Sequence, residues 1–309
     1  MNPIHHTFLA AATIFLAAPL LSAQVTESAI NKQLDKIGTL AVVQQPAAII
    51  KVATDIRSLQ AGKDKVGFAD TVAHLATKGD QGTEALQAAA DTLTQALTET
   101  PLQAKKDLPP PPYLDLARLV RYKGAKVILN DPLFAQAKQI LISNDVDIQK
   151  VDFTLKDLKG KKVTLSELKG KIVMINFWAT GCQGCNEEMG ILDFIYSHYQ
   201  SQGLVVLSIT GEEAFKVASF MATRPYHPSV LIDPNNKVAA MFHVSPTIQA
   251  AGAGMVRKGR MAQADDGASV DGIPRTFVFN RDGKLVGEGI DQCTQKQFYE
   301  MLIRTDLKP

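Results

Sequence analysis

The hydrophobic period of the chain changes once, near residue 148, and this change restricts the fold more than any other feature of the sequence. Up to about residue 145, apolar side chains recur at helical spacing. From about Val151, short apolar runs typical of strands alternate with helical segments. The 309 residues suffice for two domains of roughly 150 residues each. The sequence therefore predicts an all-α domain at 24–148 and an α/β domain at 149–309.

Apolar stripes and capping residues locate the helices of the first domain. Stripes at 49–59 and 85–97 predict two helices, the second closed by Pro101. Asp131-Pro132 supplies an N-cap and a first-turn proline for another helix, which should end near residue 141. These stripes are ordinary core faces, so the first domain is predicted to be a helical bundle.

Two further segments of the first domain bear on its role. The run from Lys105 to Pro112 ends in four successive prolines, which predicts a stiff, extended connector. No His, Cys or carboxylate in this half stands at ligand spacing, and the solitary His74 is expected to be a surface or packed residue. The helical domain is therefore expected to recruit or position a partner and to carry no chemistry.

The second domain reads as alternating strands and helices. The run 172–177 is apolar except for Asn176, as expected for a strand buried on both faces. This alternation, finished by a hairpin, predicts an α/β sandwich with a mixed sheet. Strands are expected at 151–155, 162–165, 172–177, 204–209, 230–232, 276–279 and 284–288, and helices at 183–200, 212–222, 237–242 and 295–302.

The N-terminus resembles an export signal. Thr7 to Leu21 is apolar and uncharged, and Ser22-Ala23 precedes polar Gln24, which predicts a signal peptide at 1–23. The run is short for a spanning helix of roughly 20 residues, and an uncleaved anchor is the alternative. Cleavage predicts a periplasmic or otherwise extracytoplasmic protein without stable membrane insertion. The net charge of +2 gives no reason to expect nucleic acid as a partner.

Two of the three cysteines form a Cys182-Gln-Gly-Cys185 pair where the buried strand gives way to a helix. Thiol–disulfide exchange needs a thiolate, and the positive end of a helix dipole favours that anion. Cys182 is predicted to be the attacking thiolate, and Cys185, one turn further, to resolve the mixed disulfide. An inert structural disulfide is the main alternative. A zinc site would need a second ligand pair, and c-type haem attachment would need His in place of Asn186.

Residues 149–309 resemble the TlpA/ResA branch of the thioredoxin superfamily, while residues 24–148 lie outside this resemblance. The matching segments are Leu168-Lys169-Gly170-Lys171, Asn176-Phe177-Trp178-Ala179-Thr180, Glu187-Glu188, Gly272-Ile273-Pro274 and Asn280-Arg281-Asp282-Gly283-Lys284. The resemblance implies a thioredoxin-like fold, protein thiols and disulfides as partners, and no cofactor or metal. It also leaves a membrane electron donor open.

The resemblance assigns site residues beyond the cysteines. Pro274 matches the family's cis-proline, and Trp178, Ile273 and Pro274 are assigned to substrate binding. Glu188 matches an acidic residue that tunes the thiols and relays protons, with a solvated helix carboxylate as the alternative. Asn176 stands where thioredoxin itself has a buried aspartate, which makes Glu188 the better candidate for proton transfer.

The sequence departs from the family pattern at several places. Gly181 replaces the usual Trp and is expected to uncover Cys182, while Gly184 replaces the usual Pro and loosens the turn. A Gly-rich insertion at about 245–271 is expected to form a loop beside the site. Cys293 is expected to be buried as a small apolar residue, with a resolving or intermolecular role as the alternative.

These observations predict an exported thiol–disulfide oxidoreductase that reduces protein disulfides, the reducing direction resting on the resemblance alone. One alternative is a peroxiredoxin-like peroxide reductase on the same fold, although the Pro-x-x-x-Thr/Ser-x-x-Cys loop of that class is missing before Cys182. Another is a binding module that keeps the fold without the chemistry, with Gly181 and Gly184 as signs of relaxed constraint.

Overall fold

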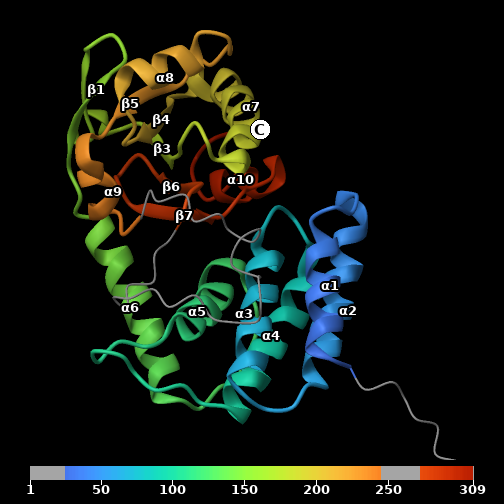
Figure 1. Ribbon diagram of the computed structural model, residues 1–309. Coiled ribbons are helices and arrows are strands. Elements are labelled where there is room, and N and C mark those ends of the chain that lie inside the picture. The colour runs from blue at the N-terminus through green and yellow to red at the C-terminus, as the bar shows by residue number, and fades with distance from the viewer. Residues whose placement is uncertain (1–24, 245–271, 309) are drawn as a thin grey trace, which may run out of the picture.

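The computed structural model describes residues 25–244 and 272–308, so the predicted signal peptide and the insertion at 245–271 lie outside the described residues. Helices form the first part of the chain, and a sheet with flanking helices forms the second (Figure 1). This confirms an all-α region followed by an α/β region, with the change of period where the sequence places it. None of the helices in the described ranges is long and apolar enough to cross a membrane.

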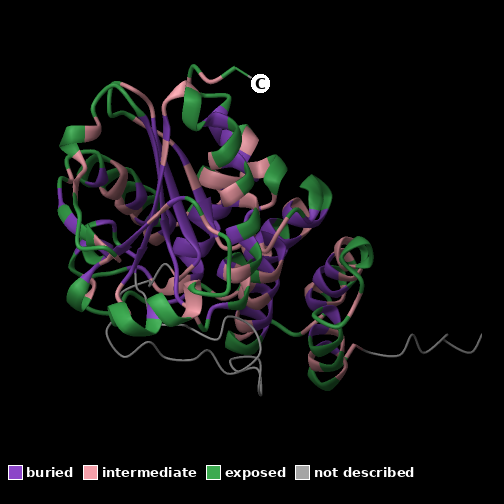
Figure 2. Ribbon diagram, turned by 90° about the horizontal axis from the view of Figure 1, so that it is seen from above, coloured by how far each residue is buried: buried purple, intermediate pink, exposed green. Residues whose placement is uncertain are grey.

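The helical region packs around one core of Ile, Leu, Val and Ala side chains, which the buried faces in Figure 2 show in purple. The stripes at 49–59 and 85–97 face this core, as their helical spacing predicts. The helices are α1 (Glu27–Ile37), α2 (Gln45–Arg57), α3 (Lys63–Thr77), α4 (Gly82–Glu99), α5 (Pro111–Lys123) and α6 (Pro132–Ile148).

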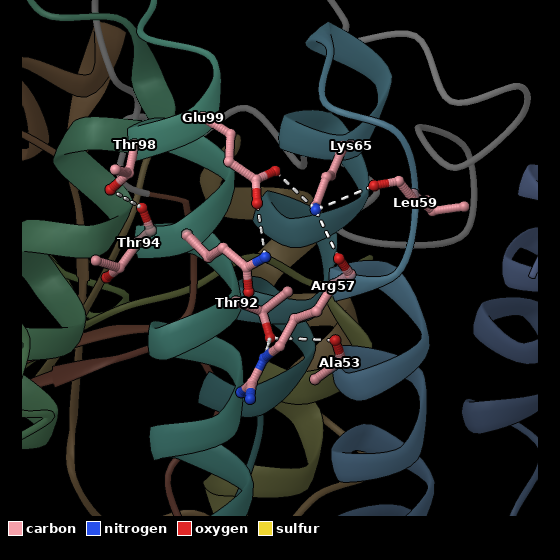
Figure 3. Close-up of polar contacts among 9 residues, drawn as sticks. Ala53, Arg57, Leu59, Lys65, Thr92, Thr94, Thr98 and Glu99 are labelled. Carbon is pink, nitrogen blue, oxygen red and sulfur yellow. Dashed lines mark hydrogen bonds and ion pairs between the residues drawn. The ribbon is translucent and has the colours of Figure 1, made fainter.

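A buried lysine connects three of these helices. The Lys65 ammonium donates to the carbonyl oxygens of Arg57, at 2.7 Å, and Leu59, at 3.1 Å, where α2 ends. It also donates to the Glu99 carboxylate at the end of α4, at 2.8 Å (Figure 3). Arg57 in turn donates to the Thr92 hydroxyl on α4 at 2.8 Å. The cost of burying the Lys65 charge is offset by three hydrogen bonds to oxygen atoms.

Two expectations for the helical region need correction. The proline run does not form an extended connector along its whole length, because Pro111 and Pro112 occupy the first turn of α5. Proline is tolerated there since the first N–H groups of a helix have no intrahelical partner. The helix that begins after Asp131 runs on to Ile148 instead of ending near residue 141. No Gly or Pro interrupts it, so nothing in the local sequence stops it earlier.

The sheet is mixed and has seven strands in the order β2-β1-β5-β4-β3-β6-β7. The central strand β3 is parallel to β4 and antiparallel to β6, and β4 is parallel to β5. This is a thioredoxin-like arrangement with an added N-terminal hairpin. The strands are β1 (Thr154–Asp157), β2 (Lys162–Thr164), β3 (Ile172–Phe177), β4 (Leu204–Thr210), β5 (Ser229–Ile232), β6 (Arg275–Phe279) and β7 (Leu285–Ile290).

Helices cover both faces of the sheet. Successive side chains of a strand point to opposite sides, so a buried apolar strand contributes to a core on each face. Val173 and Ile175 on β3 pack with Phe242 on one face, and Met174 packs with Leu192 of α7 on the other. The remaining helices are α7 (Gln183–Tyr199), α8 (Ala214–Met221), α9 (Lys237–Met241) and α10 (Gln295–Leu302). Short 3₁₀ turns lie at Val42–Gln44, Ser166–Leu168, Gln200–Gln202 and Pro234–Asn236.

Candidate active site

Cys182 and Cys185 form a disulfide between the end of β3 and the start of α7. The Cα atoms are 5.3 Å apart. Cys182 is the N-cap of α7, with extended backbone, and its sulfur accepts a hydrogen bond from the Cys185 N–H at 3.2 Å. When the disulfide is reduced, the same N–H and the positive end of the helix dipole favour a Cys182 thiolate. The structure therefore places Cys182 at the helix N-terminus where the sequence predicts it.

The pair is well covered in the oxidised state. Cys182 is 6% exposed and Cys185 is 1% exposed, so Cys182 is the more accessible of the two. The expectation that Gly181 leaves Cys182 open is wrong for this state. Gly181 itself is exposed, but Ile273 covers part of Cys182, with its carbonyl oxygen 3.8 Å from the cysteine sulfur.

The Ile273–Pro274 loop lies directly against the redox helix. The peptide bond between these residues is cis, as the resemblance implies. A Cβ atom added at Gly184 would lie 3.6 Å from the Pro274 ring and 3.4 Å from the Gln292 side chain. Gly184 therefore lets α7 pass close to both loops, and the structure brings Ile273 and Pro274 to the disulfide as predicted.

Trp178 lies beneath the disulfide and not on the surface. Its side chain is buried with both cysteines, Met189 and Val217, and its ring is 5.7 Å from that of Phe220. The indole N–H has no hydrogen-bond partner among the described residues. Little of the side chain therefore remains for a substrate to contact, in contrast to the expectation that Trp178 binds substrate.

Glu188 is buried and faces the interior of the domain. It is 1% exposed, and its two carboxylate oxygens accept hydrogen bonds from the Asn176 amide, at 3.3 Å, and from the Cys293 N–H. The alternative of a solvated helix carboxylate is therefore wrong. Burial raises the pKa of Glu188 to about 8, although both hydrogen bonds oppose that rise. At neutral pH the group is mainly protonated, one helical turn from Cys185.

Comparison with known proteins agrees with this geometry. A family model described as the AhpC/TSA family matches residues 147–287. The thiol-disulfide oxidoreductase ResA of Bacillus subtilis (strain 168) is 28% identical over 152 residues, which cover 49% of this chain and 70% of that protein. ResA of Geobacillus thermodenitrificans (strain NG80-2) is 34% identical over 135 residues, covering 43% and 63%. The C-terminal half is a thioredoxin-family domain.

A solved thioredoxin-family thiol:disulfide interchange protein from Chlorobium tepidum TLS also matches, with a TM-score of 0.38 and 22% identity. The match covers 49% of this chain and 91% of that one. The sequence relatives likewise cover about half of the chain, so the helical region stands beside the thioredoxin-family domain as an addition to it.

Cys293 follows the last strand of the thioredoxin-family domain and is buried as a free thiol, as expected. Burial raises the pKa of this thiol to about 12, which keeps it protonated and unreactive at neutral pH. Its packing is tight, since a Cβ added at Gly289 would lie 2.7 Å from its sulfur. The backbone of Cys293 has a role that could not be predicted from the sequence. Its N–H donates a hydrogen bond to the Glu188 carboxylate.

The helical region contains a charged cluster that contradicts the expectation of a solitary His74. The ligand atoms of Asp70, His74 and Asp115 lie within 4.8 Å of one another. The His74 imidazole is 3.2 Å from the Asp115 carboxylate, which raises the pKa of His74, and Arg118 bonds the same carboxylate at 2.5 Å. The Asp70–His74 spacing of four residues is readable in the sequence, but Asp115 joins only through packing of α3 against α5. Two basic side chains already neutralise the Asp115 carboxylate.

Proposed function

We propose that Cys182 and Cys185 carry the chemistry of this thiol–disulfide oxidoreductase, with Cys182 as the attacking thiolate and Cys185 as the resolving thiol. The observation that carries the proposal is the N-cap position of Cys182, where the Cys185 N–H reaches its sulfur at 3.2 Å. An inert structural disulfide would have no need of a buried carboxylate one helical turn away. The ResA relatives are named for the same activity.

The proposed reaction transfers two electrons from the dithiol to a disulfide in a substrate protein. The Cys182 thiolate attacks one substrate sulfur, forms a mixed disulfide and displaces the other sulfur as a thiolate, which takes up a proton. Cys185 then gives up its proton and attacks the Cys182 sulfur. The Cys182–Cys185 disulfide forms and the second substrate thiol leaves. A dithiol donor must reduce the pair again before the next cycle.

Glu188 is proposed to exchange protons with the pair during these steps. A buried acid with a pKa near 8 can donate a proton to a departing thiolate and accept one from Cys185 at physiological pH. Asn176 and the Cys293 N–H orient its carboxylate from opposite oxygens. The acidic residue thus replaces the buried aspartate that thioredoxin has at the position of Asn176.

We further propose that the protein is exported and works as a reductase outside the cytoplasm. The apolar run Thr7–Leu21, followed by Ser22-Ala23, supports export. The ResA resemblance supports the reducing direction, and it favours a membrane protein as the electron donor. Protein disulfides are the proposed substrates, with the Ile273–Pro274 loop as the docking edge beside Cys182.

An insulin-reduction assay with dithiothreitol tests this function. The full chain is expected to accelerate insulin precipitation, because only an oxidoreductase relays electrons from dithiothreitol to the insulin disulfides. A peroxide reductase would instead consume peroxide and leave insulin unaffected, and a binding module would do neither. Failure to accelerate precipitation would rule the proposed function out.

Glu188→Gln is expected to keep the fold and the disulfide but to flatten the pH dependence of exchange around pH 8. Glutamine preserves the shape and acceptor oxygen of the side chain, yet it cannot titrate. Exchange rates measured between about pH 6 and pH 9, a window that brackets the raised pKa, should lose one inflection in the variant. A wild-type profile in the variant would return Glu188 to a purely structural role.

The same substitution has a consequence for stability. A carboxyl whose folded pKa lies above the unfolded value costs stability as pH rises from that ordinary value, 4.5, to about 8. The free energy of unfolding of the wild-type domain should therefore fall relative to Glu188→Gln across this window. Below it the two proteins should respond alike to pH.

A further inference from the structure

Residues at the end of α3, in the helical domain, form hydrogen bonds to the loop between β7 and α10. The Gly79 N–H donates to the Gln292 carbonyl oxygen at 2.9 Å, and the Thr77 hydroxyl donates to the Asp291 carboxylate. From α10, the Gln297 amide returns a hydrogen bond to the Gly79 carbonyl at 3.1 Å. Two hydrogen bonds therefore fix this loop to the helical domain, and a third from Gln297 ties α10 to it, beside the exposed Lys296–Asp80 ion pair.

The same loop forms one wall of the redox site. The Cys293 N–H binds the Glu188 carboxylate, and the Gln292 amide donates to Glu187 at 2.5 Å. The Gln292 side chain also lies next to Gly184, inside the Cys182–Cys185 turn. A loop that touches α7 at Gly184, Glu187 and Glu188 transmits a displacement to the residues around the disulfide.

The helical domain also brings a cation to this wall. Lys123, the last residue of α5, is half-buried, and its ammonium lies 3.5 Å from the Thr77 carbonyl oxygen. Its positive charge lowers the pKa of Glu188 and that of Cys293, in opposition to burial. Lys123, at the end of α5, and Thr77, at the end of α3, thus lie together on the side of the helical domain that contacts Asp291.

We propose that the helical domain is a working part of the redox site, in which Thr77 holds the Asp291–Cys293 loop and Lys123, beside Thr77, adds a positive charge to the same side of the site. Both are positioning residues, since neither touches the disulfide. The inference rests on the proposed role of Glu188 and extends it. It assigns a task to a region that the family resemblance does not cover.

The other groups around Glu188 do not replace this contribution. Asp291 is negative and raises the pKa of Glu188, while Asn176 on β3 and the Cys293 thiol carry no charge at neutral pH. Tyr226 also interacts with the Glu188 charge, but burial raises the pKa of Tyr226 further above its ordinary value, so this phenol stays neutral. Lys123 is thus the cation among the described groups that act on Glu188.

The first test measures the titration of Glu188 in the full chain by NMR of its side-chain carboxyl carbon, assigned with Glu188→Gln. Lys123→Met should raise the midpoint, since the positive charge of Lys123 favours the carboxylate. Lys123→Arg should restore it. Thr94→Val is the matched control, because among the described residues the Thr94 hydroxyl bonds only the Ala90 carbonyl within α4. An unchanged midpoint in Lys123→Met would overturn the proposed charge effect.

The second test measures hydrogen exchange of the Cys293 amide. Thr77→Val removes the hydroxyl that binds Asp291, so the amide should exchange at least several-fold faster, with Thr94→Val at the wild-type rate. Equal rates in the wild type and in Thr77→Val would show that the helical domain does not hold the loop. The two tests measure the titration of Glu188 and the exchange of the Cys293 amide without an activity assay, so they can fail while insulin reduction succeeds. A failed insulin assay likewise leaves their outcome readable.

Discussion

Cys182→Ser is expected to abolish exchange and to trap no partner, whereas Cys185→Ser should accumulate mixed disulfides. Without Cys182 no thiolate can form at the N-cap of α7, and insulin reduction should fall to the rate of dithiothreitol alone. Without Cys185 the first step still proceeds, but nothing resolves the mixed disulfide. Non-reducing electrophoresis followed by mass spectrometry would identify the trapped species.

The order of the two cysteines can be checked without a partner. In the reduced wild type, iodoacetamide at neutral pH should alkylate Cys182 well before Cys185, because Cys182 is the more exposed and holds the thiolate. Faster labelling of Cys185, or trapping by Cys182→Ser, would reverse the assignment of the two roles.

Lys65→Met is expected to destabilise the helical domain by about 3 kcal/mol, which is the usual cost of removing one partner from a buried charged network. Lys65 is 3% exposed, and its loss removes the ammonium donor from the Arg57 and Leu59 carbonyl oxygens and from the Glu99 carboxylate, which keeps the hydrogen bond from the Gln95 amide (Figure 3). Methionine keeps the length of the side chain, so the loss reflects the ammonium and not a cavity. Urea unfolding followed by circular dichroism would measure it.

Lys51→Met is the matched control for this prediction. Lys51 forms an ion pair with Asp55 one turn away on α2, but its side chain is 67% exposed. Exposed pairs of this kind contribute about 0.2–1 kcal/mol at most. Equal losses of stability for the two variants would mean that the Lys65 network is not the anchor that its contacts indicate.

The fold of the second half was predictable because its signals are local. The apolar run at 172–177 and the turn glycines Gly160 and Gly283 determine strands and hairpins within a few residues of themselves. Cys182 and Cys185 could be assigned for the same reason, since a strand, a loop and a helix start all lie within the same short segment. The cis state of Pro274 needed the family resemblance, because the local spacing also permits an ordinary turn.

The environment of the carboxyl groups was not predictable from the sequence. Glu188 is buried by Asn176 on β3 and by the Cys293 backbone, which is 105 positions away along the chain. Asp115 reaches His74 through the packing of α3 against α5. The Thr77–Asp291 contact spans 214 positions. Contacts at such separations depend on how distant elements pack within a domain and on how the two domains dock, and hydrophobic periodicity carries no information about either.

The most direct test of the account is the reduction potential of the Cys182–Cys185 pair, measured by equilibration of the full chain with glutathione or dithiothreitol buffers. A reductase on this fold should give a value near that of thioredoxin, about −270 mV. A value near that of DsbA, about −120 mV, would make the protein an oxidant and contradict the proposed direction. A pair that stays oxidised in both buffers would be a structural disulfide, and the central claim would be wrong.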